Sequence, residues 1–187
     1  MAKIEVIKTK IKDLLIIKPT VFSDARGYFT ETFHREEYRL QGVQSRFVQD
    51  NESCSSKGVL RGLHFQTKHP QAKLVRVIRG RVYDVAVDLR KDSETFGQWE
   101  GVLLSGENKT LFYIPEGFAH GFLVLEDETV FSYKCSDYYD PSGESGVRYD
   151  DESLAIPWSQ YYSGEILISE KDRLLPSFKD WKAENPF

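Results

Sequence analysis

The sequence has little cysteine, no long apolar run and no excess of positive charge. Its two cysteines, Cys54 and Cys135, form no spaced framework of the kind that disulfide scaffolds and zinc sites require. No run approaches the roughly 18 apolar residues of a membrane-spanning helix, and no apolar stretch of signal-peptide type begins the chain. The net charge is −4 with the signs interspersed, so no basic stripe is available for a nucleic-acid backbone. We therefore expect a cytoplasmic protein with reduced thiols and with neither a membrane nor a nucleic acid as partner.

The chain does have apolar and aromatic residues in the amounts of a folded domain. Hydrophobic residues make up 40% of the chain and aromatic residues 13%, which provides the apolar surface to offset chain entropy and favours sheet. A length of 187 residues fits one domain with a substantial core. Because no repeat, low-complexity tract or linker interrupts the sequence, we expect a single domain over residues 1–187.

Short apolar runs separated by turn residues dominate the pattern, and helical periodicity is sparse. We therefore predict a mainly β fold with a few short helices, the clearest over residues 35–41. About ten strands in one domain favour a sandwich or a barrel that protects its edges, with a jelly roll as the leading choice. The expected strands cover residues 14–21, 27–33, 46–51, 59–65, 73–78, 81–89, 99–104, 110–114, 121–125 and 129–135, and residues 138–146 read as a long loop.

A histidine and a lysine lie in adjacent expected strands. His64 falls in the apolar strand 59–65, and histidine is the usual proton carrier near neutral pH. Lys73 shares a strand face with Val75 and Val77, where a lysine is costly unless it has a use. The alternatives are a core histidine satisfied by the backbone and a strand-end lysine whose amine reaches water. The residue types alone leave both alternatives open.

A tyrosine and a cysteine share the inner face of a later strand. Alternation puts Phe131, Tyr133 and Cys135 on one face and turns Lys134 away. An interior phenol needs a partner for its hydroxyl, so Tyr133 is either a core residue or an acid. We interpret Cys135 as a small interior hydrophobe, because no base at a suitable distance in the sequence would activate it.

A second histidine, His120, follows a turn with the sequence Pro-Glu-Gly-Phe-Ala and leads into the next apolar strand. Proline, glycine and histidine at this spacing match the second half of the metal-binding cupin signature. The first half would require His-x-His and a nearby Glu, whereas the chain has His64 and Gln66 at those positions and His69 in a polar loop. We therefore expect no metal and no cofactor.

Eight motifs, in order along nearly the whole chain, together resemble the dTDP-4-dehydrorhamnose 3,5-epimerases, metal-free cupin-like enzymes of nucleotide-sugar biosynthesis. Each motif is weak alone, but their joint order and spacing are hard to produce by chance. The motifs lie at residues 24–31, 48–51, 58–66, 71–76, 85–90, 115–122, 133–139 and 168–172.

The resemblance implies a homodimeric double-stranded β-helix, a cupin-like barrel, that takes a dTDP-linked 4-keto-6-deoxy sugar. The implied reaction converts dTDP-4-dehydro-6-deoxy-D-glucose to dTDP-4-dehydro-L-rhamnose in dTDP-L-rhamnose biosynthesis. Loss of a proton beside the ketone leaves an enolate, so the site needs a base, a cation at the oxygen and an acid on the opposite face. The resemblance makes His64 the base, oriented by Asp172, with Lys73 as the cation and Tyr133 as the acid.

Binding residues follow from the same resemblance. Arg26 and Arg61 match diphosphate ligands, for which guanidinium forks are suited, and Tyr139 matches an aromatic residue that stacks on thymine. In the family the segment 26–31 comes from the partner subunit, so a dimer would complete each site. The other matched contact positions are Glu31, Gln49, Asp50, Asn51, His120, Glu144 and Lys171.

Two questions stay open at this point. Strict alternation sends Arg61 and His64 to opposite faces, so both can serve one site only if the strand bulges or twists, and Gly62 is where we expect this. Relatives that epimerise C3 alone or C5 alone keep the same four chemical residues, so a mono-epimerase is an alternative. Further alternatives are a noncatalytic cupin that binds sugar nucleotides and a metal-dependent cupin oxygenase or isomerase.

The sequence departs from the family pattern at Ala72 and Ser136. We expect neither residue to contact the reacting atoms.

Overall fold

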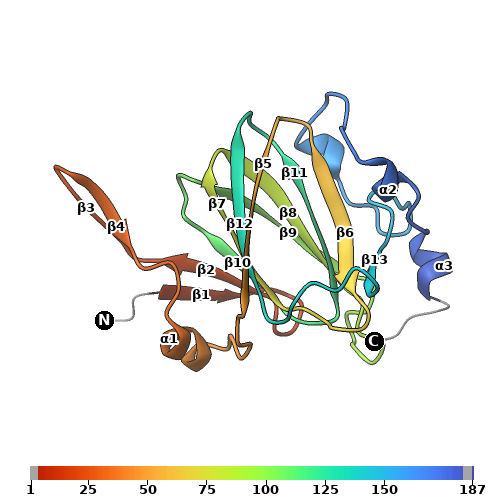
Figure 1. The fold of residues 1–187 in the computed structure, drawn as a ribbon, viewed down its shortest axis with the longest axis horizontal. Helices are drawn as coiled ribbons and strands as arrows, with labels where there is room; N and C mark the ends of the chain where they lie inside the picture. The colour runs from red at the N-terminus through yellow and green to blue at the C-terminus, as the bar shows by residue number, and fades with distance from the viewer. Residues whose placement is uncertain (1–3, 183–186) are drawn as a thin grey trace.

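Two antiparallel sheets face each other in the structure, a computed structural model that describes residues 4–182 and residue 187 (Figure 1). Residues 1–3 and 183–186 of the expected domain lie outside the described residues. One sheet has six strands in the order β1 (Ile4–Lys8), β2 (Leu15–Pro19), β10 (Leu111–Ile114), β7 (Lys73–Arg79), β12 (Thr129–Cys135) and β5 (Gln49–Ser55). The other has five, in the order β13 (Glu144–Gly146), β6 (Leu60–Gln66), β11 (Phe118–Val124), β8 (Arg81–Asp88) and β9 (Trp99–Ser105).

Short elements complete the chain, and the prediction of a cupin-like jelly roll with few helices is confirmed. A hairpin of β3 (Val21–Asp24) and β4 (Gly27–Thr30) pairs only with itself among the described strands. The helices are α1 (Arg35–Leu40), η1 (Trp158–Gln160), α2 (Glu170–Arg173) and α3 (Phe178–Lys182). Several predictions of strand bounds were wrong. Residues 14–21 divide between two sheets, and part of the loop 138–146 is β13. The strands expected at 27–33, 46–51 and 121–125 are Gly27–Thr30, Gln49–Ser55 and Phe118–Val124.

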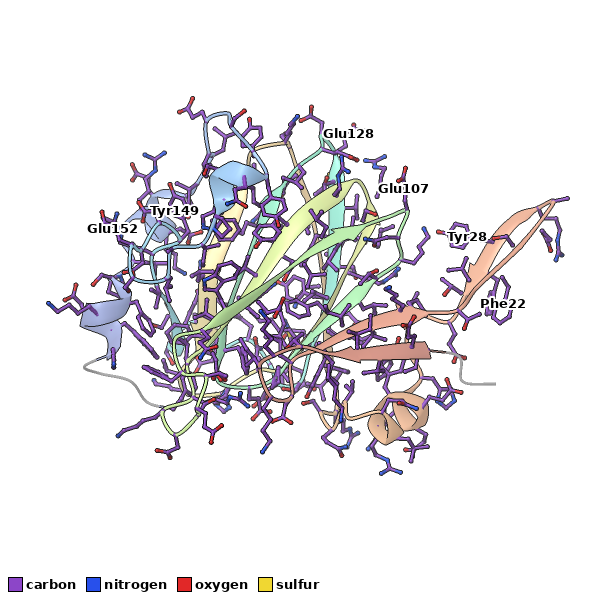
Figure 2. All side chains as sticks on the ribbon, turned by 180° about the vertical axis from the view of Figure 1, so that it is seen from behind. Phe22, Tyr28, Glu107, Glu128, Tyr149 and Glu152 are labelled. Atoms are coloured by element: carbon purple, nitrogen blue, oxygen red, sulfur yellow. The ribbon has the colours of Figure 1, made fainter. Side chains whose placement is uncertain are left out.

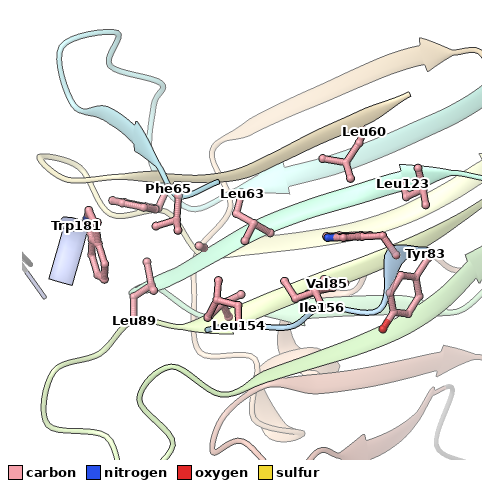
Figure 3. Close-up of a cluster of buried hydrophobic side chains, with 14 residues drawn as sticks. Leu60, Leu63, Phe65, Tyr83, Val85, Leu89, Leu123, Leu154, Ile156 and Trp181 are labelled. Carbon is pink, nitrogen blue, oxygen red and sulfur yellow. The ribbon is translucent and has the colours of Figure 1, made fainter. Parts of the chain in front are cut away.

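Both faces of the five-stranded sheet are covered, which explains why seven of the eight residues of β8 are buried. Its outward residues Tyr83 and Val85 pack under the C-terminal segment with Leu154 and Ile156 (Figure 3). Val87 and Trp158 belong to the same cluster. The inward residues Val82 and Ala86 of β8 pack in the apolar cluster between the two sheets. A strand covered on both faces loses the alternation of polar and apolar residues that marks a half-exposed strand.

The space between the two sheets holds a second apolar cluster that ends at the cleft. This cluster includes Val75 and Val77 of β7, Phe122 of β11 and Phe131 of β12. The rings of Phe122 and Phe131 stack at 4.0 Å between centroids, so they join the two sheets. The inward alternation expected for Lys73, Val75 and Val77 is confirmed, because Leu74 packs instead in a third cluster outside the six-stranded sheet, beside α1.

The bulge expected at Gly62 is present. Where β6 pairs with β11, His64 lies opposite His120 and Arg61 lies opposite Phe122, so three steps along β6 match two along β11. Leu60 and Leu63 therefore both pack on the outer face of the sheet, while Arg61 and His64 both turn to the cleft.

Gly62→Ala is expected to destabilise the fold. Gly62 has φ +127°, and a Cβ there would lie 2.5 Å from the Cα of Gly121 and 2.8 Å from the carbonyl oxygen of His120. The strained backbone alone costs about 1–3 kcal/mol, and contact with immobile backbone adds to it. Gly27 is the matched control, because it has the same φ of +127° and nothing within 4 Å of an added Cβ. Chemical denaturation should show a clearly larger loss of unfolding free energy for Gly62→Ala than for Gly27→Ala; equal losses would contradict the packing account.

The β3-β4 hairpin projects from the barrel and carries exposed aromatic residues. Figure 2 shows Phe22 and Tyr28 on this hairpin, away from the two sheets. Their side chains, with that of Phe29, are between 56% and 68% exposed, which is high for large apolar residues. The hairpin is thus a projecting apolar surface.

Candidate active site

An open cleft between the two sheets collects most of the predicted site residues. It consists of two adjoining cavities of about 530 and 370 Å³. Both cavities are lined by His64, Lys73, Tyr133 and Glu144, so they form one continuous site. The cavity of 530 Å³, called the inner cavity below, is also bounded by the apolar residues Val59, Phe122 and Phe131, and the cavity of 370 Å³ is called the outer cavity.

His64 is held by a buried carboxylate. Its Nε2 lies 2.8 Å from Oδ1 of Asp172, which is 5% exposed, while the imidazole is partly open to the cleft. Asp172 lies in α2, where the Ser169 hydroxyl caps the helix by accepting the Asp172 backbone N–H. A carboxylate on one ring nitrogen leaves the other nitrogen to exchange a proton with a ligand. The bulge at Gly62 and the cap of α2 therefore bring together residues 108 positions apart.

The electrostatics favour an ionised Asp172. Burial by itself raises its pKa, but the hydrogen bond and the charge of His64 outweigh burial, so the pKa is lowered. The backbone N–H of Gly62 also faces the carboxylate, at 3.5 Å from Oδ2. An ionised carboxylate at this position is able to stabilise an imidazolium when His64 takes up a proton.

Lys73 begins β7 with its amine in the cleft. Lys73 is half-buried, and among the described residues none forms a hydrogen bond or ion pair with its amine, which is unusual for a lysine withdrawn from water. Burial lowers the pKa of Lys73, and electrostatic interactions with Cys135, Asp84 and Glu144 oppose that effect. An unpaired amine in a partly desolvated cleft is suited to meet a negative oxygen of a ligand.

Tyr133 faces the cleft from β12, on the sheet opposite His64. Its ring packs against Phe131 with 6.0 Å between centroids, while its hydroxyl forms no hydrogen bond within the described part of the chain. Burial raises the pKa of this phenol, so it is protonated near neutral pH. Buried tyrosine hydroxyls usually have a partner, so a hydroxyl that lacks one and lines a cleft favours a ligand as the partner. Cys135 is buried on the same face, and burial raises its pKa too, as expected of a thiol that is not activated.

The sequence interpretation missed one buried carboxylate, Asp84 of β8. It is fully buried, and both its oxygens lie 3.0 Å from Nε2 of His120. Asp84 shares the inward face of β8 with Val82 and Ala86, so the available signal was a carboxylate in an apolar run. His120 is buried on β11 and lines the inner cavity, as predicted from its motif.

Charged and polar residues surround the mouth of the cleft. The Arg61 guanidinium donates to the Ser55 hydroxyl at 3.1 Å, and Lys171 pairs with Glu144 at 2.5 Å. The Tyr139 hydroxyl donates to the same Glu144 carboxylate. Of the other expected contacts, Gln49 and Asn51 line the outer cavity, and they are joined by a 3.1 Å hydrogen bond. Gln66 and Gln71, which we did not predict as contacts, line it as well.

Three predicted contacts do not line the cleft of this chain. Asp50 lies between the inward residues Gln49 and Asn51, so the alternation of β5 turns it outward, where it pairs with Lys134 at 2.9 Å. Arg26 is on the projecting hairpin, paired with Asp24 at 2.6 Å, and Glu31 follows the same hairpin. Of residues 49–51, Gln49 and Asn51 therefore line the cleft of this chain and Asp50 does not.

Two further observations concern metals and membranes. Among residues 4–182 and 187, no three His, Cys, Asp or Glu side chains are grouped as metal ligands require. No helix in the same residues has the length and apolar character needed to cross a bilayer.

The family model for dTDP-4-dehydrorhamnose 3,5-epimerase matches residues 8–180. The chain belongs to this family. It is 53% identical to the dTDP-4-dehydrorhamnose 3,5-epimerase of Methanothermobacter thermautotrophicus, across 100% of this chain and 98% of that protein. The Escherichia coli enzyme of the same name is 52% identical, across 90% of this chain and 92% of its own. The protein is therefore an isomerase of the epimerase type.

Solved structures agree with the sequence relatives. The dTDP-6-deoxy-D-glucose-3,5-epimerase of Legionella pneumophila, in complex with dTDP-4-keto-L-rhamnose, superposes with a TM-score of 0.91 at 50% identity and covers 97% of this chain and 96% of its own. A 3'-monoepimerase from Streptomyces bikiniensis, in complex with dTDP-quinovose, superposes with a TM-score of 0.82 at 33% identity and covers 95% of this chain and 96% of its own. Relatives with this fold thus include a protein named for epimerisation at two carbons and one named for epimerisation at a single carbon.

Proposed function

We propose that the chain converts dTDP-4-dehydro-6-deoxy-D-glucose to dTDP-4-dehydro-L-rhamnose, by proton transfer at C3 and at C5, in dTDP-L-rhamnose biosynthesis. The observation that carries the proposal is the arrangement of three groups around one cleft. His64, held by Asp172, enters from one sheet and the Tyr133 hydroxyl from the other, and the Lys73 amine lines the cleft with them; neither the hydroxyl nor the amine has a partner in the described part of the chain. The name of the Legionella complex supports a dTDP-linked keto sugar as the ligand.

Each group has one task in the proposed reaction. His64 removes the proton beside the C4 ketone and becomes an imidazolium that Asp172 stabilises. The electron pair of the broken C–H bond moves to the ketone oxygen, where Lys73 stabilises the enolate. Tyr133 then donates its proton to the same carbon from the opposite face, which inverts the centre. Water returns both side chains to their starting protonation states, so no oxidant or reductant is consumed.

The mouth of the cleft suits the nucleotide part of the ligand. The exposed side chains of Arg61 and Lys171 supply positive charge where the inner cavity opens to solvent, as a diphosphate requires. Tyr139, 49% exposed beside the outer cavity, offers a ring face for the thymine. Both features support a substrate that extends from the interior of the barrel to its rim.

Proton NMR of the product tests the proposal. Purified dTDP-4-dehydro-6-deoxy-D-glucose is incubated with the protein, and the coupling constants at C3 and C5 are followed over time. We expect inversion at both carbons. Inversion at C3 alone or C5 alone would establish the mono-epimerase alternative, which the similarity to the Streptomyces bikiniensis 3'-monoepimerase keeps in view. An unchanged spectrum would contradict the proposal.

We also propose that a homodimer completes each site with Arg26 of the partner subunit. Mixing an Arg26→Ala variant with a His64→Ala variant should then restore activity, because one site of each mixed dimer receives an intact His64 and an intact Arg26. Random exchange makes about half of the dimers mixed, so about a quarter of wild-type activity is expected. Mixing Arg61→Ala with His64→Ala is the control, because both residues line the cleft of one chain. No gain in the Arg26 mixture, despite exchange verified by mass spectrometry, would mean that Arg26 does not cross between subunits.

A further inference from the structure

The interior of the barrel contains a second carboxylate–histidine pair, and the mechanism above does not use its carboxylate. Asp84 of β8 and His120 of β11 come from neighbouring strands, paired with Phe122 opposite Asp84. Both residues are almost fully buried, and His120 lines the inner cavity beside Lys73 and His64. A fully buried carboxylate is expensive to maintain, so its retention beside a reacting cleft points to a use.

The geometry indicates how the two side chains share a proton. Both Asp84 oxygens lie 3.0 Å from the same ring nitrogen, Nε2 of His120. Equal distances fit a carboxylate that accepts one N–H with both oxygens, whereas a protonated carboxyl would donate through one oxygen at a shorter distance. The other nitrogen, Nδ1, forms no hydrogen bond with any residue that the structure describes.

We propose that Asp84 is a positioning residue: its carboxylate fixes His120 as the Nε2–H tautomer, so that Nδ1 accepts a hydrogen bond from a sugar hydroxyl next to the reacting carbon. This rests on the proposed function, because it takes the keto sugar as the ligand of the inner cavity. A hydroxyl on C3 or C2 is the donor chemistry that a lone Nδ1 recognises, and it would hold the sugar against the His64 side of the cleft.

The Asp84 charge has a second effect, on Lys73. Burial lowers the pKa of Lys73, and Asp84 opposes this shift together with Cys135 of β12 and Glu144 of β13. Burial raises the pKa of Asp84, and the groups that face it, His120 of β11 and Lys73 of β7, oppose that shift and favour its charged form. His120 in turn faces His64 of β6. Removing the Asp84 charge therefore lowers the pKa of Lys73 further. The alkaline limb of the kcat profile should move to lower pH, since the amine then loses its proton earlier.

The first experiment needs no variant. Nitrogen-15 NMR of the wild-type protein reports the tautomer of each histidine ring, and His120→Gln assigns the signal. We expect His120 to carry its proton on Nε2. A proton on Nδ1 would overturn the proposal, whether or not the protein epimerises the sugar, so this result is independent of the proposed function.

The second experiment compares Asp84→Asn with Asp88→Asn. Asp88 is the matched control, because it is a fully buried carboxylate of the same strand, but it pairs with Arg90 at 2.8 Å outside the cleft. We expect Asp84→Asn to lower kcat/KM roughly 10- to 100-fold, the range of one hydrogen bond to a charged group. The His120 ring should then show a mixture of tautomers, and the alkaline limb of the kcat profile should move to lower pH. Asp88→Asn should leave tautomer and pH profile unchanged. Loss of activity in Asp84→Asn with the wild-type tautomer and pH profile would assign Asp84 a structural role alone and overturn the proposal.

Discussion

His64→Ala is expected to lower kcat for epimerisation by roughly 10²–10⁴-fold, the contribution of one positioned base. The same variant should abolish exchange of solvent deuterium at C3 and at C5 alike, because one imidazole serves both carbons from one face of the sugar. Binding of dTDP should change little, since the charged residues at the rim, Arg61 and Lys171, remain. The measurements are initial rates, deuterium incorporation by NMR and calorimetric titration with dTDP.

His69→Ala is the matched control for the base. His69 also pairs with a carboxylate, Asp137 at 3.2 Å, but the pair is exposed and lies outside the cleft. Its removal should leave the rate within about twofold of the wild type, because His69 does not line the cleft. The fold should also be kept, since an exposed ion pair contributes about 0–1 kcal/mol to stability. Full exchange at either carbon by a folded His64→Ala protein would assign proton removal there to another residue.

Lys73→Met is expected to lower kcat by about 10²–10³-fold, the usual cost of one oxyanion donor, with a much smaller change in KM. Methionine keeps the length and apolar stem of the side chain, so the packing of β7 should be preserved. We expect kcat to change more than KM because the negative charge on the ketone oxygen is largest in the enolate and in the transition states that lead to it, not in the bound substrate. Steady-state kinetics over a range of substrate concentrations measures both constants.

Lys134→Met is the control for the cation. Lys134 is the lysine next to Tyr133 on β12, but it faces outward and pairs with Asp50. Its loss should leave both constants close to the wild-type values. A Lys73→Met variant with an unchanged kcat and a raised KM would make Lys73 a binding residue rather than a stabiliser of the enolate.

The alternation of apolar and polar residues predicted most strands of the barrel, because a strand with one polar face shows this alternation directly in its sequence. The inward placement of Tyr133 and Lys73 followed from that rule. The same rule would have excluded Asp50 from the cleft, since it lies between two inward residues. The expectation for Asp50 came instead from the family motif, which treats the three residues as one run.

Other features depend on contacts that no local pattern contains. The three residues of β13 form a strand because they pair with β6, and their own composition is typical of a loop. The pairing of His64 with Asp172 joins residues 108 positions apart, so only the family resemblance could suggest it. Asp84 was missed because β8 is buried on both faces and its apolar run conceals which residues turn inward.

The central claim, that His64 and Tyr133 act on opposite faces of the sugar, is tested most directly by Tyr133→Phe in heavy water. Phenylalanine keeps the contact with Phe131 and the base at His64, and it removes only the hydroxyl that would deliver the second proton. The account predicts that proton NMR will show deuterium entering C3 or C5 with retained configuration, while the inverted product is lost or stops after one centre. Wild-type inversion at both carbons in a folded Tyr133→Phe protein would contradict it.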